Sequence, residues 1–131
     1  TFGDFTGTAT GEIAALEVAQ DGRRLLTAYR FEGFGLEGMA DSAELPEVED
    51  RIEAADWVGG NAEELVVRDL AGNFLFYELD AEAEKLHRVL TVPGPRTVLG
   101  WAITNGNTDA GELVCVRPNG EVWRADAREY R

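Results

Sequence analysis

Residues 64–77 have the sequence ELVVRDLAGNFLFY, in which two apolar runs flank a turn signal at Leu70-Ala71-Gly72. Apolar runs of this length, bounded by turn residues and rich in Val, Phe and Tyr, are typical of strands that are buried on both faces. A glycine in the short segment between two apolar runs is a hairpin signal, because such turns need a positive φ. We therefore predict a strand, a tight turn and a second strand inside a packed sheet.

The same pattern occurs at two other places in the chain. EIAAL begins at Glu12 and ELVCV begins at Glu112, so the three copies start 52 and 48 residues apart, and each is followed by a turn glycine and a second apolar run. Self-similarity at a fixed period is the sequence signature of propellers, solenoids and trefoil-like arrays. We predict an all-β fold with little helix and about ten to twelve short strands, forming a single domain, 1–131, of three repeats (1–50, 51–98 and 99–131).

The connections between the repeats differ in length. We predict a long surface loop over 33–52 with a helical segment at 43–55, a short helical turn or a wide loop at 81–85, and a strand at 86–92. The Pro93-Gly94-Pro95 stretch then ends the second repeat.

Composition limits the classes of partner. The chain has 131 residues, of which 44% are apolar, enough for one compact domain, and no apolar run approaches the roughly 20 residues of a membrane helix. The net charge of −13 argues against nucleic-acid binding, which needs clustered Lys and Arg. Dispersed acidity with a single lysine, Lys85, fits a soluble surface and a salt-rich habitat. An acidic inhibitor that mimics nucleic acid is the alternative interpretation of the charge.

The residues of common catalytic sites are scarce. His87, Ser42 and Cys115 are each the only residue of their type, so the sequence lacks a zinc-ligand cluster and a nucleophile with its base. His87 is expected on a solvent-facing strand position, and Cys115, between two valines, is expected to be a buried small hydrophobe. We therefore expect a protein that is not an enzyme.

Three segments resemble a known family at the entry to each repeat. They are GDFTGTATGEI (3–13), ADWVGGNAEEL (55–65) and GWAITNGNTDAGEL (100–113). These segments are similar to the FG-GAP or VCBS-type β-propeller repeat, whose loops carry the pattern Asp-aromatic-Asp-Gly-Asp-Gly followed by Asp-Leu. The resemblance implies propeller blades, calcium in the loops and a location outside the cell or on its surface.

Calcium needs six to eight oxygen ligands, and most of the family's loop carboxylates are missing from this chain. The fullest remaining set is Asp4, Thr6, Thr8 and Glu12 in the first repeat. A turn held by side-chain hydrogen bonds explains the same residues without a metal, and we expect no bound cofactor.

Three repeats are too few to close a propeller, which has four to eight blades. Either several chains complete the ring, or the chain is part of a larger protein, or the repeats close as a β-trefoil. Self-association is expected if the units are blades, because a terminal blade exposes an apolar face and an unpaired edge.

Aromatic residues near the repeat entries suggest one further function. Trp101 with Asn105, Asn107 and Asp109 has the composition of a carbohydrate-binding site, in which a ring stacks on a sugar and polar groups orient it. The competing interpretation is that Phe5, Trp57, Trp101 and Trp123 form the core between repeats. The preferred function is a non-catalytic β-repeat protein that acts through protein–protein contacts, with a lectin-like module as the alternative.

Overall fold

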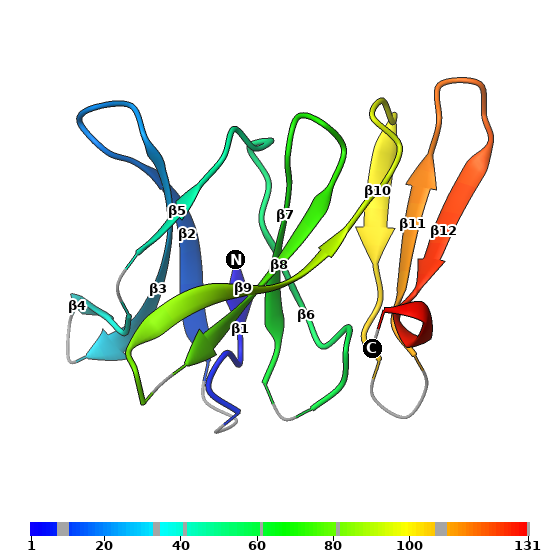
Figure 1. Cartoon of the computed structure of the whole chain (residues 1–131). Coiled ribbons are helices and arrows are strands. Elements are labelled where there is room, and N and C mark those ends of the chain that lie inside the picture. Colours follow the sequence, from blue (N-terminus) through cyan, green and yellow to red (C-terminus); the bar gives the residue numbers. More distant parts are fainter. Residues whose placement is uncertain are drawn as a thin grey trace.

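The computed structural model describes residues 1–7, 11–32, 35–40, 42–60, 62–80, 82–106 and 110–130. Within these described residues, twelve strands form three antiparallel sheets that stand side by side in the order of the chain (Figure 1). This confirms the all-β class and the expected number of strands. In the described part of the chain the helical structure is one 3-10 turn, η1 (Ala127–Glu129), and no helix is long and apolar enough to cross a membrane.

Each sheet is built from consecutive strands. The first contains β1 (Phe2–Gly3), β2 (Glu12–Val18), β3 (Arg24–Glu32) and β4 (Gly35–Gly38), with β5 (Ala43–Leu45) also paired to β3. The second contains β6 (Glu53–Ala55), β7 (Glu64–Arg68), β8 (Phe74–Asp80) and β9 (Lys85–Val92). The third contains β10 (Gly100–Ile103), β11 (Glu112–Val116) and β12 (Val122–Asp126). The strand predicted at 86–92 is therefore confirmed as β9.

The central hairpin of every sheet uses one turn geometry. The glycines Gly22, Gly72 and Gly120 have φ of 86°, 101° and 87°. Each donates its N–H to the carbonyl three residues earlier, at 2.9, 3.1 and 2.9 Å. A turn that ends in a left-handed glycine next to a bulge is a common three-residue hairpin loop. The same local chemistry thus closes β2–β3, β7–β8 and β11–β12.

The helical segment predicted at 43–55 is wrong, and the segment predicted at 81–85 as a helical turn or a wide loop is a turn that leads into a strand. Residues 43–55 contain β5 and β6 at their ends, and an isolated bridge joins Val48 to Asp69 between them. Pro46 disfavours a helical conformation at the residue before it, and Leu45 and Val48 are buried in the core. In the other segment Lys85 begins β9, residues 82–84 form a turn, and Ala81 lies outside the described residues.

The long surface loop predicted for residues 33–52 is also partly wrong. β4 lies inside it and pairs with β3, with Leu36 opposite Phe31. Because that pairing depends on a neighbouring strand, the glycine-rich composition of the segment concealed it.

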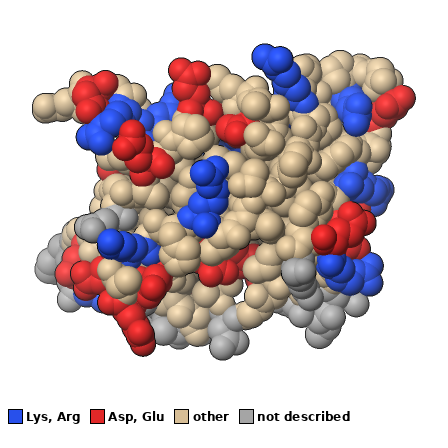
Figure 2. All heavy atoms as spheres, in the orientation of Figure 1, with Lys and Arg blue, Asp and Glu red and all other residues tan. Residues whose placement is uncertain are grey.

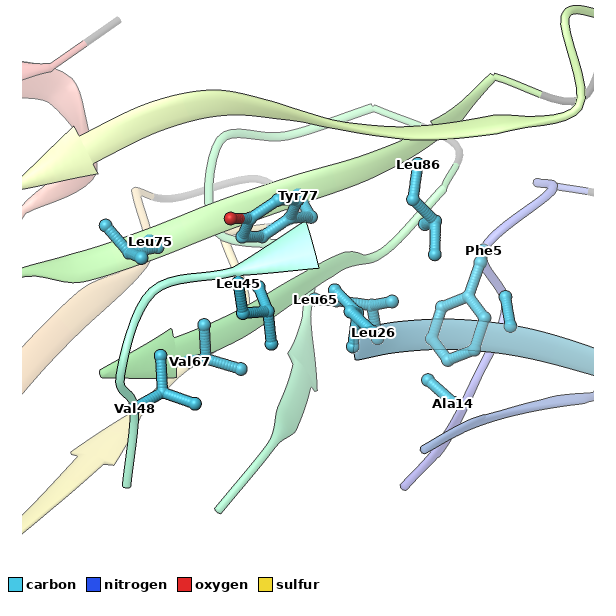
Figure 3. Packing of buried hydrophobic residues seen from close by; sticks show 11 residues of the cluster. Phe5, Ala14, Leu26, Leu45, Val48, Leu65, Val67, Leu75, Tyr77 and Leu86 are labelled. Carbon is cyan, nitrogen blue, oxygen red and sulfur yellow. The ribbon is translucent and has the colours of Figure 1, made fainter. Parts of the chain in front are cut away.

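Two cores fill the spaces on either side of the second sheet. Between the first and second sheets, side chains from β2, β3, β5, β7, β8 and β9 pack with two residues of the connecting segments (Figure 3): Phe5, Ala14, Leu26, Ala28, Leu45, Val48, Leu65, Val67, Leu75, Tyr77 and Leu86. Between the second and third sheets lie Trp57, Val66, Phe74, Phe76, Val92, Trp101, Leu113, Cys115, Ala125 and Ala127. All five residues of β7 are buried, as the continuous apolar run predicted.

Arg68, at the end of β7, is a buried cation with 3% of its surface exposed. Its guanidinium donates to Glu49 at 2.8 Å, to the carbonyl of Arg96 at 3.2 Å and to the carbonyl of Pro95. It therefore ties the segments before and after the second sheet to the end of a central strand.

Candidate interaction surfaces

Two buried glutamates occupy the same position at the start of β2 and β7. The N–H of Phe5 donates to Glu12 at 3.2 Å, and the N–H of Trp57 donates to Glu64 at 3.0 Å, in both cases across seven residues. Val58 donates a second N–H to the same oxygen of Glu64 at 2.8 Å. Each carboxylate therefore satisfies backbone donors of a buried loop, which would cost free energy if left unpaired.

The candidate calcium residues of the first repeat belong to this hydrogen-bonded loop. The hydroxyl of Thr6 donates to Glu12 at 2.6 Å, and Asp4 accepts the N–H of Gly7 at 2.9 Å. Thr8 lies outside the described residues. Side chains of Asp4, Thr6 and Glu12 are thus arranged as turn-closing acceptors and donors, and the described residues contain no cluster of three or more His, Cys, Asp or Glu suited to a metal ion.

The entry loops of adjacent sheets are joined by the same kind of hydrogen bonds at both junctions. The main chain of Asp4 exchanges two hydrogen bonds with Glu63, accepting its N–H at 2.8 Å and donating to its side chain at 3.0 Å. Asp56 donates its N–H to the side chain of Asn105 at 2.9 Å and accepts the N–H of Gly106. The residue before each loop aromatic therefore binds the entry loop of the next sheet.

The candidate carbohydrate cluster is only partly described. Trp101 lies in β10 with 8% of its surface exposed, and the guanidinium carbon of Arg51 lies 3.7 Å from the centre of its ring. Asn105 is exposed but its side-chain oxygen is bound to Asp56, whereas Asn107 and Asp109 lie outside the described residues. A sugar could stack on this indole only by displacing Arg51.

The other loop aromatics contribute to the cores. Trp57 stacks on Phe76 with ring centres 4.7 Å apart, and Phe74 meets Trp101 edge to face at 5.2 Å. Phe5 is 1% exposed in the other core. Offset and edge-to-face pairs of this kind add about 0.5–1.5 kcal/mol to the burial of the rings. These aromatics therefore join the sheets rather than line a pocket.

The first sheet leaves one face uncovered, which we call the N-terminal outer face. Direct strand partners lie on the same side of a sheet, so the pairs Phe2–Ile13, Ile13–Tyr29 and Phe31–Leu36 place these five side chains together. Phe2, Phe31 and Leu36 are 70%, 62% and 52% exposed, and none of the five belongs to either core. Leu25, Ala15 and Glu17 continue the face along β3 and β2.

The third sheet leaves the C-terminal outer face uncovered at the other side of the molecule (Figure 1). The pairs Ala102–Val114, Val114–Arg124 and Val116–Val122 define it. Val116 is 38% and Val122 is 53% exposed, and Arg124 pairs with Glu112 at 2.6 Å. Uncharged surface also extends over the region of β9 and β10 (Figure 2).

Sequence reasoning did not identify these faces as sites, although the signal was present. In β2 and β3 both phases of the alternation are apolar, with Ile13 and Leu25 on one side and Ala14 and Leu26 on the other. Such a pattern indicates burial on both faces. His87 is exposed and Cys115 is buried, as the sequence predicted, and burial raises the pKa of the Cys115 thiol.

Comparison with protein-family models, with curated proteins and with solved structures found no match to this chain.

Proposed function

We propose that this chain is a non-catalytic assembly protein, which acts through protein–protein contacts made by its two outer faces. One observation carries the proposal: both terminal sheets have an uncovered face with exposed apolar side chains, while the sheet between them is covered on both sides. Exposed apolar faces of this kind mark interaction surfaces, because removing apolar surface from water is favourable by about 25 cal/mol per Å², before the entropic costs of association are subtracted.

The blade-like interpretation of the three sheets is part of the proposal. The shared hairpin turn, the buried glutamates at the same place in β2 and β7, and the sequential stacking of the sheets support it. A propeller of three blades is open, so a partner is needed to cover its two sides.

The test is the mass in solution, measured by light scattering over a range of concentrations. We expect a discrete species heavier than the 14.3 kDa chain. Val122→Lys should shift this species toward the monomer, because it replaces an exposed apolar side chain of the C-terminal outer face with a charge that the contact would bury. Val18→Lys is the matched control, since Val18 is more accessible than Val122, at 66% against 53%, but lies on neither outer face.

A wild-type protein that remains a 14.3 kDa monomer at every concentration would overturn the proposal. An oligomer that both lysine variants disrupt equally would show that the contact is not made by the outer faces.

A further inference from the structure

We propose that the partner is a second copy of this chain, bound head to tail. The C-terminal outer face of each copy covers the N-terminal outer face of the other, and two copies close a ring of six sheets. This inference rests on the proposed function, and adds to it which faces meet and how many chains are needed.

The first argument is the direction of the two internal contacts. Ala14 and Leu26 of the first sheet pack toward Leu65 and Leu75 of the second. The opposite side of the second sheet, which includes Val66, then packs toward the third. Each sheet therefore offers one defined side to the sheet before it and the other to the sheet after it.

The second argument is that each outer face corresponds, residue by residue, to a face that a neighbouring sheet covers elsewhere in the molecule. Counting from the glutamate that starts β2, β7 and β11, Ile13 corresponds to Leu65 and Leu113, both of which are covered by the preceding sheet. By the same count Val114 corresponds to Val66, which is covered by the following sheet. The first sheet thus lacks a predecessor and the third lacks a successor.

The third argument is size. With strands about 4.8 Å apart and about 3.4 Å per residue, the face of the third sheet measures about 14 by 17 Å. This is smaller than the roughly 800 Å² per partner of a standard interface, so one such contact would be weak. A two-chain ring makes two contacts for a single loss of translational freedom, and its six sheets fall within the range of four to eight blades.

Charge disfavours contact between two copies of the N-terminal outer face. The C-terminal outer face carries one cation, Arg124, which is paired with Glu112 at 2.6 Å, and Asp126 lies opposite Glu112 on the same side. The N-terminal outer face carries Glu17, which accepts the hydroxyl of Tyr29, and Glu44, which is paired with Leu25 across the strands. Two copies of the N-terminal face against each other would bring like charges together, which disfavours that arrangement.

Complementation between two blocked variants tests the arrangement. Val122→Lys blocks the C-terminal outer face and Ile13→Lys blocks the N-terminal one, so each should be monomeric alone, with a dissociation constant at least about tenfold weaker than that of the wild type. Mixed in equal amounts at high concentration, they retain one intact face each and should form a species of twice 14.3 kDa. Val18→Lys mixed with wild type is the control and should form the wild-type oligomer.

Thermal unfolding first confirms that each variant is folded, and Phe31→Lys, at a 62% exposed position of the same face, replaces Ile13→Lys if that variant is not. Oligomers formed by one blocked variant alone would overturn the head-to-tail arrangement in favour of contacts between like faces. A wild-type oligomer whose blocked variants associate no more tightly as a mixture than either does alone would overturn it too, while leaving the proposed assembly function intact. A monomeric wild type would overturn both.

Discussion

Glu64 has the most perturbed carboxyl group among the described acidic residues. Burial raises its pKa to about 7, and the negative charges of Asp56 and Glu78 act in the same direction, against the lowering effect of the N–H groups of Val58 and Trp57. Both N–H groups reach the same oxygen, Oε1, so the carboxyl can hold a proton on Oε2 without losing either bond. A protonated Glu64 at the start of β7 is thus compatible with the loop geometry.

This raised pKa predicts that stability falls with pH. The folded state holds a proton on Glu64 up to about pH 7, whereas the unfolded chain releases it near pH 4.5. The contribution of Glu64 to the free energy of unfolding should therefore be fully present below pH 4.5. It should be lost as the pH rises to 7, which lowers the free energy of unfolding by about 3 kcal/mol in all. Chemical denaturation at pH 5, 6, 7 and 8 measures the decrease.

Glu64→Gln supplies the comparison, because an amide keeps the Oε1 acceptor and cannot ionise. The free energy of unfolding of this variant should fall much less between pH 5 and 8 than that of the wild type. Glu12→Gln, which changes the corresponding residue of β2, should show the same decrease as the wild type. The assignment fails if the wild type and Glu64→Gln show the same pH dependence.

At the scale of the residue, the sequence showed where these acids lie but not what they do. The family resemblance implies a metal loop, whereas the preferred interpretation is a turn held by side-chain hydrogen bonds. In the structure Glu12 and Glu64 accept backbone N–H groups. A carboxylate at the end of a glycine-rich loop fits both uses. Only the direction of the surrounding N–H groups separates them, and that direction depends on the folded loop.

At the scale of the element, the turn glycines allow conformational strain to be separated from steric overlap. A Cβ on Gly22 would meet nothing within 4 Å, whereas a Cβ on Gly72 would lie 2.5 Å from the carbonyl oxygen of Pro95 and 2.9 Å from the Cα of Arg96. Both positions have a positive φ, so alanine costs about 1–2 kcal/mol at either.

We expect Gly22→Ala to lower the free energy of unfolding by only that amount. Gly72→Ala should lower it by about 2–5 kcal/mol, because backbone atoms next to the turn must also move. Urea denaturation of both variants measures the difference, and Gly120→Ala, which also has open space around it, should resemble Gly22→Ala. Equal losses of unfolding free energy at Gly22 and Gly72 would show that the Pro93–Arg96 segment moves aside at little energetic cost.

The hairpins were predictable and several other strands were not, for one physical reason. The turn and apolar runs of 64–77 are local signals, so they specify β7 and β8 by themselves. β4 and β5 are short, and both take their conformation from pairing with β3. Their own composition, with two glycines in one and an acidic flank in the other, favours a loop.

At the scale of the whole molecule, the net charge of −13 opposes association between copies. Screening that repulsion should strengthen the dimer, because the Debye length falls from roughly 14 Å at 0.05 M salt to about 4 Å at 0.5 M. We expect the dissociation constant to fall several-fold over this range, as measured by sedimentation equilibrium. Val122→Lys should remain monomeric at both salt concentrations, and an association that weakens with salt would indicate a contact held mainly by ion pairs.

The arrangement of the sheets also limits which features of the fold can be predicted from the sequence. The period of the repeats predicted three similar β units, and the structure has three sheets in chain order. Which faces remain open depends on how many units stack and whether they close, and this is a property of the assembled layers. No single stretch of residues encodes it.

Because the second sheet is covered on both sides, it should be the last part of the chain to unfold locally. Its strands β7 and β8 are shielded from solvent by one neighbour on each side, whereas the first and third sheets have one side open. Backbone amides in β7 should therefore exchange with deuterium through the largest opening of the fold, and those of β2 and β12 through smaller fluctuations at either side. The middle of the chain would be the last region to take up the label.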